Sequence, residues 1–149
     1  MPTENILIRN KKASFEYSFI ETYVAGIQLA GTEIKSIRAN KASINDAYCA
    51  FINGELFVKG MHIAEYEFAS HYNHMAKRER KLLLNKSELF KLAQQLKDKS
   101  LTIIPVKLFL NEKGFAKLEI ALAKGKKTFD KRDDIKKRDL ERETGRRFK

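Results

Sequence analysis

Apolar and polar residues alternate in several stretches of the chain, and this period of two predicts an antiparallel β-protein. Residues 15–29 alternate, slip in register near residue 21 and then resume, which is typical of one long strand that contains a bulge. Asn53-Gly54 separates two short apolar runs. Because a type I′ turn needs positive φ at both central residues, this dipeptide predicts a β-hairpin.

A second hairpin is predicted further along the chain. Residues 102–110 and 116–122 alternate on either side of a turn at residues 111–114. Pro105 cannot donate a hydrogen bond to a neighbouring strand, so its strand must lie at a sheet edge or be bulged there. A further short strand is expected at residues 81–84.

Two helices are predicted between these strands. Thr32 can cap a short helix over residues 33–38. Asn85 and Glu88 resemble a capping box, and apolar residues then recur at helical spacing, which predicts an amphipathic helix over about residues 85–98. The order of these elements favours a mainly β fold: a small closed antiparallel OB-like barrel with two or three helices, because closure hides strand edges.

The charge of the chain is strongly basic and unevenly spread. Thirty Lys and Arg against 19 Asp and Glu give a net charge of +11, and residues 124–149 hold twelve of the basic and six of the acidic residues. Such an excess attracts polyanions, so nucleic acid is the leading partner class. The alternative is a basic protein without such a partner.

The last residues contain too few apolar side chains to form a core. Beyond Phe129 only Ile135, Leu140 and Phe148 could offset a backbone ordering cost of about 1–2 kcal/mol per residue. We therefore expect an OB-like RNA-binding barrel over residues 1–129 and a basic C-terminal tail, residues 130–149, that is disordered when free. Oppositely charged pairs at i+3 and i+4 spacing would favour a helix in this tail on a partner surface.

The sequence offers little for catalysis. The histidines are His62, His71 and His74, and no third metal ligand lies near the last two in sequence. The chain contains no Gly-rich phosphate loop and no nucleophile elbow. We therefore expect no enzyme activity, no metal and no cofactor, and we interpret the histidines as surface or RNA-contacting residues.

Cysteine usage and hydropathy indicate a compartment. Cys49 is the single cysteine, so no intramolecular disulfide can form, which suits a reducing environment, and its apolar neighbours predict a core position. No basic and apolar leader opens the chain, and no run of 18 apolar residues occurs. We expect a cytoplasmic protein that does not enter a membrane.

Basic residues interleaved with aromatic ones are typical of RNA binding, because cations contact phosphates and exposed rings stack on unpaired bases. Tyr72 and Phe129 lie in polar surroundings and are the aromatic residues that we expect to be exposed. The basic candidates are Arg9, Lys11, Lys12, the cluster at residues 77–81, Lys117, Lys124, Lys126 and Lys127.

Two longer motifs resemble one known family. They are Gly31-Thr-Glu-Ile-Lys-Ser-Ile-Arg38, followed by Lys41-Ala42, and Ala123-Lys-Gly-Lys-Lys-Thr-Phe-Asp-Lys-Arg132. With shorter matches in the same order, the chain resembles the SsrA-binding protein family, also called small protein B, from about residue 9 to residue 142. This resemblance implies an OB-like barrel without enzymatic activity.

The resemblance also implies partners and a role in ribosome rescue. The family binds the tRNA-like domain of tmRNA, the SsrA RNA, and delivers it to stalled ribosomes for trans-translation. Its C-terminal tail enters the vacant mRNA channel of the small subunit, among rRNA, and becomes helical there. Alanyl-charged tmRNA with elongation factor Tu is a further expected partner, and we expect a monomer.

Individual residues can be carried over by position. Asn10, Leu83 and Lys117 match residues that the family uses to grip RNA, and Lys124, Lys126 and Lys127 match the basic segment that leads into the tail. Lys11 and Lys81 are added as neighbouring cations. The residues expected to face the ribosome are Phe129, Asp130, Lys131, Arg132, Lys136 and Arg138.

The sequence departs from the family pattern at two of these places. Val24 stands where the family often has a glutamate, and Phe129 replaces a frequent His or Tyr. The alternative function is a general RNA-binding or ribosome-associated barrel without dedicated tmRNA specificity. A basic hydrolase that uses His71 or His74 is a remote third hypothesis.

Overall fold

Nine strands and three helices make up the described part of the chain. The computed structural model describes residues 5–69 and 73–126. The strands are β1 (Asn5–Arg9), β2 (Tyr17–Ile27), β3 (Ala42–Ser43), β4 (Tyr48–Ile52), β5 (Glu55–Lys59), β6 (His62–Ile63), β7 (Arg80–Leu83), β8 (Leu101–Leu110) and β9 (Ala116–Gly125). The helices are α1 (Ala13–Glu16), α2 (Gly31–Arg38) and α3 (Lys86–Gln95).

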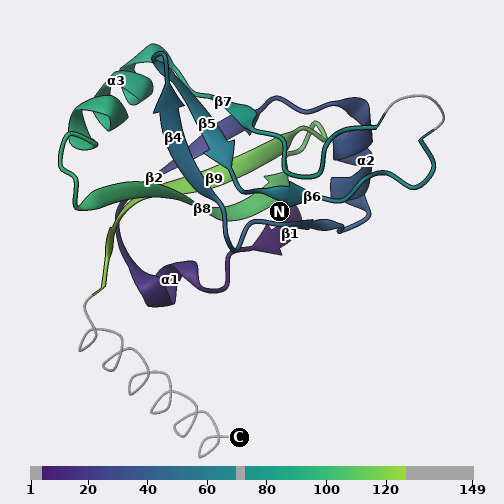
Figure 1. The fold of residues 1–149 in the computed structure, drawn as a ribbon, viewed down its shortest axis with the longest axis horizontal. Coiled ribbons are helices and arrows are strands. Elements are labelled where there is room, and N and C mark those ends of the chain that lie inside the picture. Colours follow the sequence, from purple (N-terminus) through teal and green to yellow (C-terminus); the bar gives the residue numbers. More distant parts are fainter. Residues whose placement is uncertain (1–4, 70–72, 127–149) are drawn as a thin grey trace, which may run out of the picture.

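Six of these strands close into an antiparallel ring in the order β8, β4, β5, β7, β2 and β9 (Figure 1). Strand β9 follows β8 along one edge, while β1 and β4 take successive parts of the other edge. Strands β3 and β6 form a separate pair. The prediction of a mainly β, closed antiparallel fold is therefore confirmed.

Both predicted hairpins are present. Asn53 and Gly54 have φ of 50° and 81°, as a type I′ turn requires, and they join β4 to β5. The pairing of β8 with β9 shifts register between Pro105 and Lys107, so the proline lies at a bulge. The predicted bulge in β2 is also confirmed, because its register against β9 shifts between Phe19 and Glu21.

The helices begin and end differently from the sequence prediction. The predicted strand begins at residue 15, but residues 13–16 form the short helix α1 and the observed strand begins after it. Helix α2 is capped at Ala30, not at Thr32, because Glu33 turns back and accepts a hydrogen bond of 2.8 Å from the Ala30 backbone N–H. Helix α3 has the predicted capping box at Asn85 and ends at Gln95.

Buried apolar side chains from the strands and helices form one large core cluster. Cys49 lies in this core as predicted, and burial raises the pKa of its thiol. A second, smaller cluster lies where α1 contacts β8 and β9, and it contains Ala13, Ile104, Ala121 and Ala123. The largest fully buried apolar side chains of the interior are Ile37, Ile44, Leu56, Met61, Ile63, Leu82, Leu92, Ile103, Leu108 and Leu118.

None of the helices in residues 5–69 and 73–126 has the length and apolar character needed to span a membrane.

Candidate RNA-binding surface

Leu83 and Lys117, two residues carried over from the family, come together on the outside of the ring. Strand β2 lies between β7 and β9, and Gly26 is paired with Leu83 on one side and with Lys117 on the other. A Cβ atom placed on Gly26 would lie 3.3 Å from the Leu83 Cβ and 3.6 Å from the Lys117 Nζ. The absence of a side chain at Gly26 thus lets the lysine ammonium lie beside the leucine.

Val24 extends this surface along β2. It lies two residues before Gly26, on the same face of the strand, and Val24 and Leu83 expose 53% and 46% of their surface. Within the described residues Lys117 forms no ion pair. We call Val24, Gly26, Leu83 and Lys117 the Leu83–Lys117 patch. It offers apolar contact and one uncompensated cation.

Asn10 lies on the opposite side of β8 and β9 from this patch. Its backbone N–H donates to the Val106 carbonyl at 2.8 Å, and its Nδ2 donates to the Pro105 carbonyl at 2.9 Å. The Asn10 amide therefore satisfies the backbone at the β8 bulge. Lys11 follows with an exposed side chain.

The other predicted lysines lie in three different settings. Lys81 is paired with Glu55 at 3.1 Å, so part of its charge is compensated. Lys124 is exposed near the end of β9, seven residues from Lys117, which corresponds to about 23 Å of extended strand. Lys126 donates from its backbone N–H to the Glu16 carbonyl and from its Nζ to the Ser14 carbonyl, both at 2.9 Å.

The predicted site residues on and after β9 lie in two groups, one near each end of this strand. One end is the Leu83–Lys117 patch, and the other is the segment after β9, which is held against α1. Lys127, Phe129, Asp130, Lys131, Arg132, Lys136 and Arg138 lie outside the described residues, as do His71 and Tyr72.

The basic cluster at residues 77–81 is only partly a surface feature. Arg80 is completely buried, and its Nε donates to the Glu33 carboxylate, which is buried as well. Arg78 donates to the other oxygen of Glu33 at 2.6 Å. Arg80 is thus not a candidate for RNA contact, because its charge is used to join the loop before β7 to α2.

The ion-pair network shifts the pKa of Glu33. Burial alone would raise the pKa of Glu33, but the hydrogen bonds from Arg78, from the Ala30 backbone N–H and from Arg80 outweigh it. The net pKa of Glu33 is lowered. The carboxylate is therefore ionised in the folded protein at neutral pH.

His74 is a structural residue, which corrects the expectation of a surface or RNA-contacting histidine. Its ring lies 3.0 Å from the Thr32 Oγ1 through Nδ1 and 2.9 Å from the Ile63 carbonyl oxygen through Nε2. Only 2% of His74 is exposed. Both ring nitrogens are used to hold α2 against β6 and the loop before β7.

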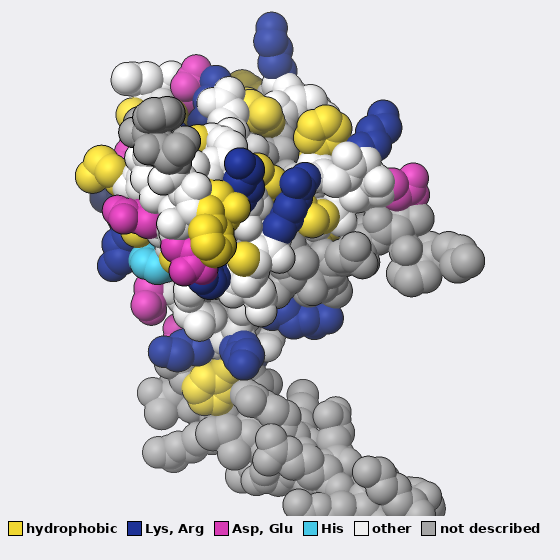
Figure 2. All heavy atoms as spheres, turned by 90° about the vertical axis from the view of Figure 1, so that its right-hand side faces the viewer, with side chains coloured by type: hydrophobic (Ala, Val, Ile, Leu, Met, Phe, Trp, Pro, Cys, Tyr) yellow, Lys and Arg dark blue, Asp and Glu magenta, His cyan; other side chains and the backbone are white. Residues whose placement is uncertain are grey.

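The end of the molecule that carries α2 shows charges of both signs among exposed hydrophobic side chains (Figure 2). A cavity of about 330 Å³ lies there, with Ile34, Arg38, Lys113 and Phe115 in its lining. Because acidic and basic side chains are mixed, the positive excess of the chain is not concentrated on this face.

Sequence reasoning missed the central residue of the patch. A glycine inside a strand often marks a place where another group approaches closely, so Gly26 carried a usable signal. The buried acceptor for Arg78 and Arg80 gave no such signal, since Glu33 has the ordinary position of an acidic residue in the first turn of a helix.

Comparison with known proteins decides the family. The profile of the family described as SmpB protein matches residues 7–149. The chain belongs to the SmpB protein family. An SsrA-binding protein of Phocaeicola vulgatus is 62% identical over 97% of this chain and 96% of its own length, and one of Desulforudis audaxviator is 48% identical over 96% and 93%.

A solved structure supports the same assignment for the fold. It is described as "tmRNA-SmpB: a journey to the center of the bacterial ribosome", and it matches with a TM-score of 0.68 at 44% identity. The match covers 81% of this chain and 85% of that one. The solved structure thus shares the fold of this chain, and the family profile also matches the residues of the tail.

Proposed function

We propose that this chain binds the tRNA-like domain of tmRNA through the Leu83–Lys117 patch and delivers tmRNA to stalled ribosomes for trans-translation. The observation that carries the proposal is the meeting of Leu83 and Lys117 over Gly26, in a member of the SmpB family. Their roles are to bind and position RNA. Because ribosomes are its proposed site of action, the protein would act in the cytoplasm.

The chemistry of the patch suits RNA. A lysine without a counter-ion can neutralise a phosphate, and the release of condensed cations then favours binding. Exposed Leu and Val side chains can cover the apolar faces of riboses and splayed bases, which protein surfaces contact in loops of folded RNA. Val24 supplies such a contact where the family often has a carboxylate, so it adds no negative charge beside Lys117.

The other end of β9 suits a separate task. Lys124 and Lys126 lie where the chain leaves the ring, and Lys126 is tied to α1 by two hydrogen bonds. We infer that this anchored segment directs the C-terminal tail towards the small subunit, where the tail probes an mRNA channel that holds no message. The description of the similar solved structure names tmRNA-SmpB and the bacterial ribosome, which supports the ribosome as a partner.

A side-by-side titration tests the function. Purified protein is titrated into labelled tmRNA and into an uncharged elongator tRNA at one near-physiological salt concentration, because basic proteins bind any RNA at low salt. A clear preference for tmRNA is the expected result. Equal affinities would instead indicate a general RNA-binding protein and overturn the proposal.

The double variant Leu83→Ala, Lys117→Ala is expected to weaken tmRNA binding roughly tenfold or more and to lower the slope of log K against log salt by about one, since one phosphate contact is lost. Filter binding at several salt concentrations measures both. Lys97→Ala, an exposed lysine after α3, serves as a charge-matched control for Lys117→Ala alone. Equal losses in these two single variants would show that the patch has no special role.

A further inference from the structure

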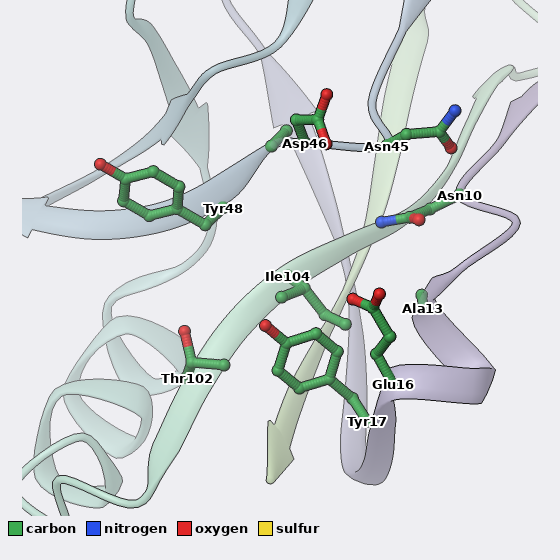
Figure 3. A pocket seen from close by; sticks show the side chains of 10 residues that line it. Asn10, Ala13, Glu16, Tyr17, Asn45, Asp46, Tyr48, Thr102 and Ile104 are labelled. Carbon is green, nitrogen blue, oxygen red and sulfur yellow. The ribbon is translucent and has the colours of Figure 1, made fainter. Parts of the chain in front are cut away.

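A cavity of about 360 Å³ lies outside the ring, between α1, β8 and the segment that enters β4. Figure 3 shows Glu16 and Tyr17 on the α1 side, Asn45, Asp46 and Tyr48 on the β4 side, and Thr102 and Ile104 of β8 between them. A volume of this size is within the range of small-molecule sites. Neither the patch nor the anchored segment uses these side chains.

Two carboxylates in the lining can only accept hydrogen bonds, whereas the amide and hydroxyl groups of the other polar lining residues can donate or accept. Glu16 and Asp46 are exposed, and neither forms an ion pair within the described residues. Asn10 uses its Nδ2 on the Pro105 carbonyl, and its buried Oδ1 has no hydrogen-bond partner. A ligand with adjacent N–H donors would therefore suit the two carboxylates.

The remaining lining offers flat apolar faces. Tyr48 exposes 48% of its surface on β4, and Tyr17 packs on the small apolar cluster under α1. Aromatic faces of this kind stack on unpaired bases. The cavity thus combines rings with acceptors.

The surroundings of the cavity are basic. An adjoining hollow of about 290 Å³ shares Asn10 and Ala13 with the cavity and is lined by Arg9, Lys11 and Lys107. The cations of the adjoining hollow suit a ligand with a negatively charged backbone. The carboxylates in the cavity suit N–H groups on the part of the ligand that enters it. An RNA chain with an exposed base has this distribution.

Among the four RNA bases, guanine fits the lining best. Its N1–H and N2–H₂ groups lie side by side, so a single carboxylate can accept two hydrogen bonds from it. Adenine and cytosine offer one amino group, and uracil offers one imino group. A carboxylate, which can only accept, thus favours the base with the most adjacent donors.

We propose that this cavity binds an unpaired guanine of RNA, a site that deepens the function proposed above. The Glu16 carboxylate, which points towards Asn10 in Figure 3, accepts from guanine N1–H and N2–H. Asp46 provides a further acceptor, and Tyr17 and Tyr48 contact the faces of the base. Because the Glu16 carbonyl also holds Lys126, the guanine lies at the base of the tail, in tmRNA or in small-subunit rRNA.

The test uses the full-length protein and three fluorescent pentanucleotides, UUGUU, UUAUU and UUIUU, at one near-physiological salt concentration. Inosine keeps N1–H and lacks the N2 amino group. The wild type is expected to bind UUGUU roughly tenfold more tightly than the other two. If the wild type bound all three pentanucleotides with equal affinity, the proposal would be overturned without recourse to a variant.

The double variant Glu16→Gln, Asp46→Asn locates the site. It is expected to bring the three affinities within about twofold of one another, because amides no longer accept two hydrogen bonds from guanine. A purely electrostatic effect would instead raise all three affinities and keep their ratio, and that result would overturn the proposal. Glu112→Gln, an exposed glutamate on the β8–β9 turn, is the matched control and should keep the ratio.

Two further titrations distinguish the source of the guanine and separate this proposal from the proposed function. Loss of affinity of the double variant for tmRNA, or for isolated small subunits, assigns the guanine to that RNA, and unchanged affinity for both would overturn the site. Preference of the wild type for tmRNA over tRNA tests only the function. The protein could prefer tmRNA over tRNA even if the cavity had no preference for guanine. Failure of the guanine proposal is therefore distinguishable from failure of the proposed function.

Discussion

Removing residues 130–149 is expected to abolish tagging on stalled ribosomes while the affinity for free tmRNA stays within about threefold of the full-length value. The structure supports this separation, because the deletion leaves β9 and the Lys126 anchor intact. The Leu83–Lys117 patch lies towards the other end of β9. Contacts to the tRNA-like domain should therefore survive the deletion.

The charge removed by this deletion explains the small loss that remains. Residues 130–149 contain nine basic and six acidic residues, so the truncated chain keeps +8 of the original +11. Fewer cations weaken non-specific attraction to RNA. Tagging requires the tail itself, because no other segment of the chain would occupy the mRNA channel in the proposed mechanism.

Reconstituted translation on a message without a stop codon measures the outcome. The full-length protein should add the tag, and the truncated protein should not, while filter binding shows tmRNA retained. A matched control exchanges two tail residues of like charge, Lys136→Arg and Arg138→Lys, and should keep tagging. Loss of tmRNA affinity on truncation would contradict the division of roles between ring and tail.

Glu33→Gln is expected to lower the free energy of unfolding by about 3–5 kcal/mol. The substitution keeps the size of the side chain and removes its charge, which leaves Arg80 buried without a counter-ion. Arg80 keeps its hydrogen bonds to the Met61 and Arg78 carbonyls, both at 2.9 Å, so the loss comes mainly from the ion pair. Such a loss is a large part of the stability of an ordinary domain.

Urea unfolding followed by circular dichroism measures the change. Glu55→Gln is the matched control, because its partner Lys81 lies 3.1 Å away in an exposed pair that contributes less than about 1 kcal/mol. If the two variants lost the same stability, the buried network would not be a main support of α2.

The same network predicts a dependence on pH. The pKa of Glu33 in the folded protein lies below its ordinary value of 4.5, so the ionised carboxylate stabilises the fold above that pH. This stabilisation is lost as the pH falls below 4.5 and through the folded value. Glu33→Gln has no such carboxylate, and its stability should fall less steeply over this acidic range.

Local sequence signals predicted much of the fold. Asn53-Gly54, the capping box at Asn85 and the alternation on both sides of residues 111–114 each fix structure within a few residues, and all three are present. Helix α1 was missed because Phe15 and Tyr17 keep the period of the following strand. The cap of α2 was misplaced because Glu33 is turned inward by arginines 45 and 47 residues away, which no local pattern reports.

The candidate site depended more on tertiary structure. Leu83 and Lys117 were selected through their family positions, but their meeting over Gly26 requires β7, β2 and β9 to be neighbours. Arg80 belongs to a basic cluster, and only its inward position on β7 shows that its charge is internal. The cavity beside α1 is formed by three segments distant in sequence, so spacing alone gave no reason to connect Glu16 with Asp46.

The closure of the ring through β9 also constrains how the protein is made. Most of β2 is paired with β9, from Tyr17 opposite Gly125 to Gly26 opposite Lys117, whereas β7 reaches only its last two residues. A nascent chain that stops before residue 116 leaves β2 without its main partner, and pairings between such distant residues form slowly. Incomplete chains would thus expose β2 as an unpaired strand, which proteases can cleave.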